Sequence, residues 1–201
     1  MTKLLSICIP TVDGREEQLN VLLFKIKSQI KDFQDDVEII IEKDDKTMTI
    51  GAKRNVMHQK AAGLFTWTID DDDSVNHISK VIGAIIEFGN DIDCIGFKEL
   101  CIFNGKKVES SCFSLRYDDW ADNVDGYNHV RTPFFKTPIK TSIVQSTLVE
   151  DIRFAEDHAF ARAIKPKLNN EYFIDEFVYI YQHNDEGKGH EYRYGFYKDN
   201  K

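Results

Sequence analysis

Apolar runs and amphipathic segments alternate along the first third of the chain. Residues 4–10, 37–41 and 64–69 are short, continuous apolar stretches, as expected of strands buried on both faces of a parallel sheet. The segment that starts at residue 16 carries leucine or isoleucine every three or four positions, and residues 50–62 end before a glycine, so both are predicted to be helices. This order predicts an α/β fold with a Rossmann-like, doubly wound, mostly parallel sheet and helices on both faces.

The rest of the chain has a different pattern. Asn104 and Gly105 separate two strand-like segments, residues 93–103 and 106–115, which predicts a small antiparallel hairpin. Residues 117–135 are polar and aromatic with little periodicity, and we expect a loop region over a site. The other expected elements are a helix around residues 78–86, a helix at 155–164, a strand at 173–182, and an aromatic tail at 184–201 that docks on the body or acts as a lid.

Composition narrows the class of protein. With 201 residues, 42% of them hydrophobic, the chain is long enough for one core, and a single domain over residues 1–201 is expected. A net charge of -8 disfavours non-specific binding to nucleic-acid phosphates. No stretch approaches the roughly 20 apolar residues of a membrane span, and Pro10 interrupts the first apolar run too early for a signal peptide. We therefore expect a cytoplasmic protein with reduced cysteines.

Four consecutive aspartates, Asp70 to Asp73, follow the third predicted strand directly. So much negative charge in one place is unfavourable unless a cation neutralises it. Mn2+ or Mg2+ binds carboxylate oxygens and leaves positions for water and phosphates. Because ligands of doubly wound sheets bind at the carboxyl ends of the strands, the aspartates lie where a metal site is expected. The alternative is a solvated acidic loop in which Asp72 or Asp73 caps the next helix.

Three segments together resemble family 2 glycosyltransferases of the GT-A fold. They are the opening strand and loop SICIPTVDGR, the central stretch GAKRNVMHQKAAGLFTWTIDDDD, and the later stretch RFAEDHAFA. In this resemblance Asp70 and Asp72 are the DxD pair of the family, and Arg54 and Asn55 are the Arg-Asn pair that precedes it. The order and spacing of the three segments carry the resemblance, since each segment alone is a weak signal.

The resemblance implies a metal-dependent, inverting glycosyltransferase that moves a sugar from a nucleotide-diphosphate sugar to an acceptor hydroxyl. Residues 1–75 would then form the half that binds the nucleotide sugar, and residues 76–183 the acceptor-side half. Asp157 is expected to take the proton of the acceptor hydroxyl as general base. Glu156, beside it, is expected to hold the acceptor or to orient the base.

The same resemblance implies where the cation is held. Asp72 is the expected metal ligand, with Asp70 nearby, and the bound cation would stabilise the charge that develops on the leaving diphosphate. A histidine late in the chain is a common third ligand in this fold class. His183, just after the last predicted strand, is the candidate, and His190 is its competitor.

Candidate donor contacts gather after the first two predicted strands. Thr11, Asp13 and Arg15 offer a hydroxyl, a carboxylate and a guanidinium to the base, ribose or phosphates. By resemblance an acidic residue after the second strand recognises the base, and Glu42 and Asp44 both remain candidates because the family usually has aspartate where this chain has Glu42. A UDP-sugar is the expected donor. The full set of expected donor contacts is Thr11, Asp13, Arg15, Glu42, Asp44, Arg54, Asp70 and Asp71.

The acceptor is left open between a glycan and a modified nucleobase, such as the hydroxymethylated DNA bases that phage enzymes glycosylate. A basic edge formed by Lys136, Lys140, Lys165 and Lys167 would suit the second. Two other functions compete with sugar transfer. A nucleotidyltransferase should have a glycine-rich phosphate loop, and PTVDGR has only one glycine; a non-catalytic nucleotide- or carbohydrate-binding module would bind without turnover. Calcium binding is disfavoured because the aspartate run lacks the alternating ligand spacing of an EF-hand.

Overall fold

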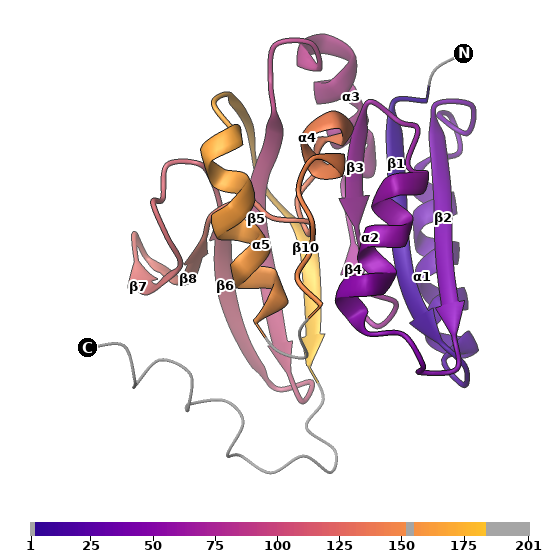
Figure 1. The fold of residues 1–201 in the computed structure, drawn as a ribbon. Helices are drawn as coiled ribbons and strands as arrows, with labels where there is room; N and C mark the ends of the chain where they lie inside the picture. Colours follow the sequence, from indigo (N-terminus) through magenta and orange to yellow (C-terminus); the bar gives the residue numbers. More distant parts are fainter. Residues whose placement is uncertain (1–2, 152–154, 184–201) are drawn as a thin grey trace.

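In the residues that the structure describes, 3–151 and 155–183, ten strands form one mixed sheet with helices on both faces (Figure 1). The structure is a computed structural model. Its strands are β1 (Leu5–Val12), β2 (Val37–Asp44), β3 (Phe65–Thr68), β4 (Ser74–Val75), β5 (Cys94–Phe103), β6 (Lys107–Phe113), β7 (Ala121–Val124), β8 (Tyr127–Arg131), β9 (Ile139–Lys140) and β10 (Glu171–His183). Its helices are α1 (Glu16–Gln29), α2 (Ile50–Lys60), α3 (Ile78–Phe88), α4 (Thr141–Gln145) and α5 (Glu156–Ile164), followed by a 3-10 turn, η1 (Lys165–Lys167).

The N-terminal strands form the parallel part of the sheet. β1 pairs in parallel with β2 on one side and with β3 on the other. Every residue of β1 from Leu5 to Thr11 is buried, as predicted for a strand covered on both faces. α1 and α3 contact each other behind the sheet in Figure 1, and α2 packs on β1 and β2 in front of it. The predicted α/β fold class is confirmed.

The last described strand returns to the middle of the sheet. β5 and β6 form the predicted antiparallel hairpin, and β10 pairs in parallel with β5. β10 also pairs antiparallel with the two-residue strand β4, which follows the aspartate run directly. Residues far apart in the sequence therefore meet beside the four aspartates.

The prediction of a loop region at residues 117–135 was wrong in part, because β7 and β8 form a hairpin there. Asp125 and Gly126 make its turn with positive φ angles of 53° and 81°, and Asp-Gly is a strong hairpin signal. β7 is mostly exposed, so it lacks the apolar alternation that marks a half-buried strand. β8 joins β6 in parallel and extends the sheet on that side.

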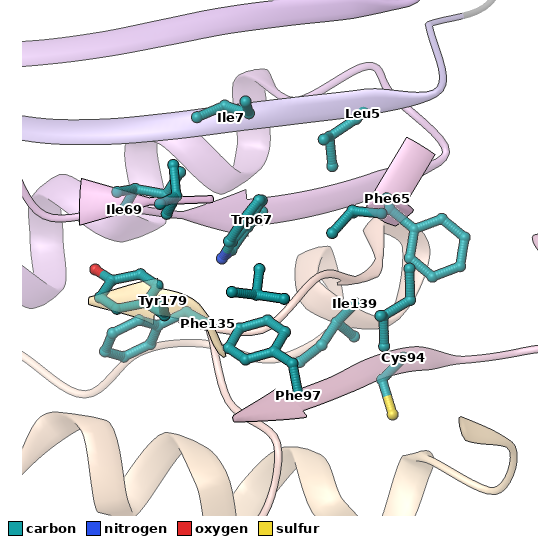
Figure 2. Close-up of a cluster of buried hydrophobic side chains, with 14 of the residues drawn as sticks. Leu5, Ile7, Phe65, Trp67, Ile69, Cys94, Phe97, Phe135, Ile139 and Tyr179 are labelled. Carbon is teal, nitrogen blue, oxygen red and sulfur yellow. The ribbon is translucent and has the colours of Figure 1, made fainter. Parts of the chain in front are cut away.

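The core lies between the parallel strands and β5 (Figure 2). Trp67 on β3 and Phe97 on β5 are fully buried, with ring centroids 6.0 Å apart. The turn before β3 needs a glycine, because a Cβ at Gly63 would lie 2.7 Å from the backbone nitrogen of Ser6. Burial of a large apolar side chain such as Phe97 stabilises the fold by about 1.5–3 kcal/mol. This packing holds β3, and with it the position of the aspartates that follow.

The four cysteines are free and buried, as expected of reduced, structural thiols. No helix in the described ranges is long and apolar enough to cross a membrane. The predicted tail or lid at residues 184–201, which includes His190, lies outside the described residues.

Candidate active site

Two hollows meet beside the aspartate run. The first, which we call the strand-end cleft, has a volume of about 980 Å³ and lies at the carboxyl ends of β1 and β3. The second, which we call the hairpin pocket, has a volume of about 390 Å³ and lies between the β5–β6 hairpin and the first turn of α5. Arg54, Asp70 and Tyr181 line both, so the two hollows adjoin at these three residues.

The four aspartates have different surroundings. Asp71 is buried and accepts a hydrogen bond from the Thr11 hydroxyl at 2.6 Å, while Asp72 keeps 48% of its side chain exposed. The Arg15 guanidinium pairs with both carboxylates, at 2.9 Å from Asp71 and 2.5 Å from Asp72. Burial raises the pKa of Asp71 above its usual value. Asp72 is therefore the carboxylate of this set that is open to the cleft, and Asp71 holds Thr11 and Arg15 in place.

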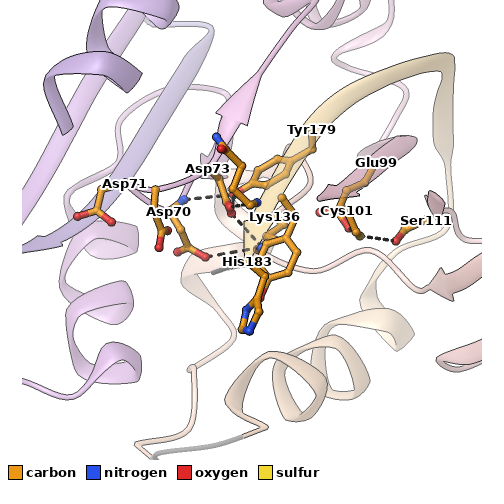
Figure 3. A network of polar contacts seen from close by, with 12 residues as sticks. Asp70, Asp71, Asp73, Glu99, Cys101, Ser111, Lys136, Tyr179 and His183 are labelled. Atoms are coloured by element: carbon orange, nitrogen blue, oxygen red, sulfur yellow. Dashed lines mark hydrogen bonds and ion pairs between the residues drawn. The ribbon is translucent and has the colours of Figure 1, made fainter. Parts of the chain in front are cut away.

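Asp73 joins the aspartate run to β10 and to the segment before β9 (Figure 3). Its carboxylate accepts hydrogen bonds from the Tyr179 hydroxyl at 2.7 Å and from the Gln182 backbone at 3.0 Å, and it lies 3.2 Å from Lys136. The Tyr179 hydroxyl in turn accepts from the Asp70 backbone N–H at 3.2 Å. Burial raises the pKa of Asp73 to about 7. Asp73 thus fixes the shape of the loop that presents its neighbours.

Lys136 is part of this cluster and not part of a basic edge. Burial opposes its charge, but the carboxylates of Asp73 and Asp70 raise its pKa above the usual value. The other three lysines of the expected edge donate to main-chain carbonyls of separate segments: Lys140 to residue 90, Lys165 to residues 115 and 117, and Lys167 to residue 146. Lys136 is therefore not part of the expected basic edge, and an edge formed by the other three lysines stays a prediction.

Arg54 connects the two hollows. It is only 4% exposed, lies 3.9 Å above the ring of Phe135, and pairs with Asp70 at 3.0 Å and with Glu156 at 2.6 Å. Burial opposes its charge, but the two carboxylates raise the pKa of Arg54. Asn55, the next residue, exchanges hydrogen bonds with the Val149 backbone at 2.8 and 2.9 Å. The Arg-Asn pair therefore ties α2 to the chain segment that leads to α5.

The predicted catalytic pair lies where α5 begins and lines the hairpin pocket. The Glu156 carboxylate forms an ion pair with the Arg54 guanidinium. Asp157 accepts a hydrogen bond from the backbone N–H of His158 at 2.8 Å, and its carboxylate makes no ion pair within the described residues. Among the described residues no other side chain occupies this carboxylate, so it can accept a hydrogen bond from a hydroxyl in the pocket.

Three expected donor contacts do not line the strand-end cleft. Asp13, Glu42 and Asp44 each pair with a nearby lysine, at 2.8 Å for Asp13 and 2.6 Å for Glu42. Asp44 also accepts from the backbone N–H of Met48 at 2.7 Å, which shapes the loop before α2. The donor candidates that line the cleft are Thr11, Arg15, Arg54, Asp70 and Asp71.

The expected metal ligands Asp70, Asp72 and His183 all line the strand-end cleft. They are not gathered into one group, and within the described residues no three His, Cys, Asp or Glu side chains are placed to hold a metal ion together. His183 lies 3.0 Å from the Tyr181 hydroxyl through its Nδ1 atom. An exposed carboxylate in an open cleft still fits Mn2+ or Mg2+, because these ions take one or two protein carboxylates and fill their other positions with water and substrate phosphates.

Sequence reasoning missed several residues of the site. Tyr179, Tyr181 and Glu99 come from β10 and β5, where they read as ordinary strand positions. Trp120, which lines the hairpin pocket, lies in the region expected to be a loop. Only the pairing of β10 beside the aspartate run shows that the two tyrosines belong there.

No protein-family model matches this sequence, and no curated protein sequence is significantly similar to it. Solved structures are similar in fold. S. aureus TarS, residues 1–349, has a TM-score of 0.63 at 18% identity, over 89% of this chain and 60% of TarS. The same protein in complex with UDP-GlcNAc has a TM-score of 0.63 at 16% identity, over 89% of this chain and 58% of that one.

A second similar structure is the mannosyltransferase PcManGT from Pyrobaculum calidifontis, in complex with GDP-Man and Mn2+. It has a TM-score of 0.53 at 10% identity, over 90% of this chain and 57% of PcManGT. This chain spans less than two thirds of the length of each of these proteins. At such low identities the likeness concerns the architecture: the chain has the α/β fold of GT-A-like glycosyltransferases.

Proposed function

We propose that this protein is a metal-dependent, inverting glycosyltransferase of the family 2 type, with a UDP-sugar as donor and a hydroxyl as acceptor. The observation that carries the proposal is the junction of the two hollows at Arg54 and Asp70. On one side Arg15 and the open carboxylate of Asp72 suit a diphosphate and its cation, and on the other side Asp157 suits a hydroxyl. The fold is shared with TarS, which binds UDP-GlcNAc, and with PcManGT, which binds GDP-Man and Mn2+.

The strand-end cleft is the proposed donor site. Arg15 has 35% of its side chain exposed and is held at the cleft by Asp71, so its guanidinium can contact the phosphates of the donor. Asp72, with Asp70 beside it and His183 as the further candidate, would hold Mn2+ or Mg2+. When bound, the cation would supply charge neutralisation for the departing nucleotide diphosphate.

The hairpin pocket is the proposed acceptor site. The acceptor oxygen attacks the anomeric carbon of the donor sugar, the bond from that carbon to the diphosphate oxygen breaks, and its electron pair leaves with the diphosphate. The Asp157 carboxylate accepts the hydroxyl proton. Glu156 is held by Arg54 and acts as a positioning residue for Asp157. A single displacement inverts the configuration at the anomeric carbon.

The donor half is tested by isothermal titration with nucleoside diphosphates and nucleotide sugars, with and without Mn2+. We expect Mn2+-dependent binding of one nucleotide to the wild type, and its loss in Asp72→Ala. Asp45→Ala is the matched control, because Asp45 is exposed and lies outside the cleft lining. If no nucleotide binds under any metal condition, the proposed function is wrong.

The acceptor half is tested with Asp157→Asn, which keeps the size of the side chain and removes its basicity. General-base catalysis contributes about 100- to 10,000-fold, so kcat should fall by that range while the nucleotide affinity stays unchanged. Equal turnover by the variant and the wild type would show that Asp157 is not the general base. Nucleotide binding by the wild type without any turnover would favour a binding module instead.

A further inference from the structure

The hairpin pocket contains an unsatisfied hydrogen-bond donor. The indole nitrogen of Trp120 is buried, and it has no hydrogen-bond partner among the described residues. Buried indole N–H groups usually find a partner, and an exception calls for an explanation such as a missing ligand. The other tryptophan obeys the rule, because Trp67 donates to the carbonyl of Lys136 at 2.7 Å. A ligand in the pocket that reaches the indole nitrogen with an accepting atom would supply the missing partner.

Cations that line the pocket are already paired with carboxylates of the chain. Arg54 pairs with Asp70 and Glu156. Lys136 pairs with Asp70 and Asp73. Arg131 pairs with Asp122 at 3.1 Å. The ring of His129 lies between Asp122, at 2.8 Å, and a glutamate of β6, at 2.9 Å. An incoming anion would have to compete with these carboxylates for each positive charge.

Two carboxyl groups in the pocket are not held by a cation at ion-pair distance within the described residues. Glu99 is 5% exposed and accepts a hydrogen bond from the Cys101 thiol at 3.2 Å (Figure 3). Burial raises the pKa of Glu99 above its usual value. Asp157 is the second of these carboxyl groups, and among the described residues it accepts a hydrogen bond only from the backbone N–H of His158. Both groups can hydrogen-bond to a hydroxyl, and neither offers the positive charge that favours a phosphate.

We propose that the hairpin pocket binds an uncharged, hydroxyl-rich acceptor, a neutral sugar residue, and discriminates against acceptors that carry phosphate at that position. The Trp120 N–H donates a hydrogen bond to an oxygen of the sugar, and the Glu99 carboxyl group accepts a hydrogen bond from one of its hydroxyls. The volume of about 390 Å³ falls within the roughly 300–1,000 Å³ of small-molecule sites. The inference rests on the proposed function, since it names the acceptor class of the same site.

The two tryptophans provide the assay. In a nitrogen-15 correlation spectrum of the full chain with nucleoside diphosphate and Mn2+ bound, Trp67 and Trp120 give two indole signals, and Trp120→Phe assigns them. The probes are methyl glycosides of glucose, galactose, mannose and N-acetylglucosamine, each compared with its 6-phosphate. At least one neutral glycoside should shift the Trp120 signal saturably while the Trp67 signal stays in place. Its half-saturating concentration should be at least tenfold below that of its phosphate.

Glu99→Gln supplies the charge control, because glutamine keeps the size and hydrogen bonds of glutamate without the charge. The ratio between phosphate and neutral half-saturation should fall in this variant, and an unshifted Trp67 signal shows that it is folded. Tighter binding of the phosphates, or no shift of the Trp120 signal by any glycoside, would overturn the inference. Nucleotide binding in the strand-end cleft is measured separately, so its presence with either result leaves the proposed function intact.

Discussion

Arg54 is the residue whose loss should damage both hollows at once. It is 4% exposed and holds two carboxylates, Asp70 at 3.0 Å and Glu156 at 2.6 Å. Arg54→Met keeps most of the side-chain volume but leaves both carboxylates without this cation. Breaking a buried ion pair by removing one partner costs about 3–5 kcal/mol. For a chain of this size that corresponds to a fall in Tm of roughly 6–20 °C.

The loss of stability in Arg54→Met should become smaller as the pH falls. In the wild type burial opposes ionisation of Asp70, but Arg54 and Lys136 bring its pKa below the usual value. Its contribution to stability is therefore present above the unfolded pKa and is lost as the pH falls through the lower, folded pKa. In Arg54→Met the carboxylates of Asp70 and Glu156 lose this cation and take up protons more readily, which reduces the loss of stability at low pH. The stability difference between wild type and variant should shrink from about pH 7 to about pH 4.5.

Chemical denaturation at the two pH values measures the effect. Lys60→Met is the control, because Lys60 has 55% of its side chain exposed and pairs with Glu42 on the surface. Exposed pairs of this kind contribute about 0–1 kcal/mol. Equal losses for Arg54→Met and Lys60→Met at neutral pH would refute the reasoning. A cost for Arg54→Met that grows on acidification would refute it as well.

Two further predictions concern the metal and the backbone. Arg15→Ala should tighten Mn2+ binding in the absence of nucleotide by about 1.5- to 5-fold, because it frees Asp72 from an ion pair of about 0.2–1 kcal/mol; calorimetry that finds unchanged or weaker Mn2+ binding would contradict this. Gly63→Ala should lower stability by about 1–3 kcal/mol, since its Cβ would lie 2.7 Å from Ser6. Gly83→Ala, in α3 with no atom within 4 Å of the added Cβ, should instead raise it by about 0.5–1 kcal/mol, and equal Tm values for the two variants would count against the contact argument.

Local patterns in the sequence determined most of the regular structure. The apolar runs that became β1 and β3 are buried strands because no amphipathic period offers them a solvated face. The aspartate run lies at the carboxyl end of β3 because it follows that strand directly in the chain. Neighbouring residues alone set this short-range order, so the fold class and the strand end at which the aspartates lie were predictable. The β7–β8 hairpin was missed because its exposed strand carries no apolar period.

Only the tertiary structure decided what each polar residue does. Four chemically identical aspartates became one open carboxylate and three held ones, because partners from β1, α2, β10 and the segment before β9 reach different members of the run. Arg54 and Glu156 lie 102 positions apart in the sequence and are 2.6 Å apart in space. Lys136 resembles a surface lysine until the fold surrounds it with carboxylates. Burial and long-range pairing set these charges, and neither is visible in the local order of residues.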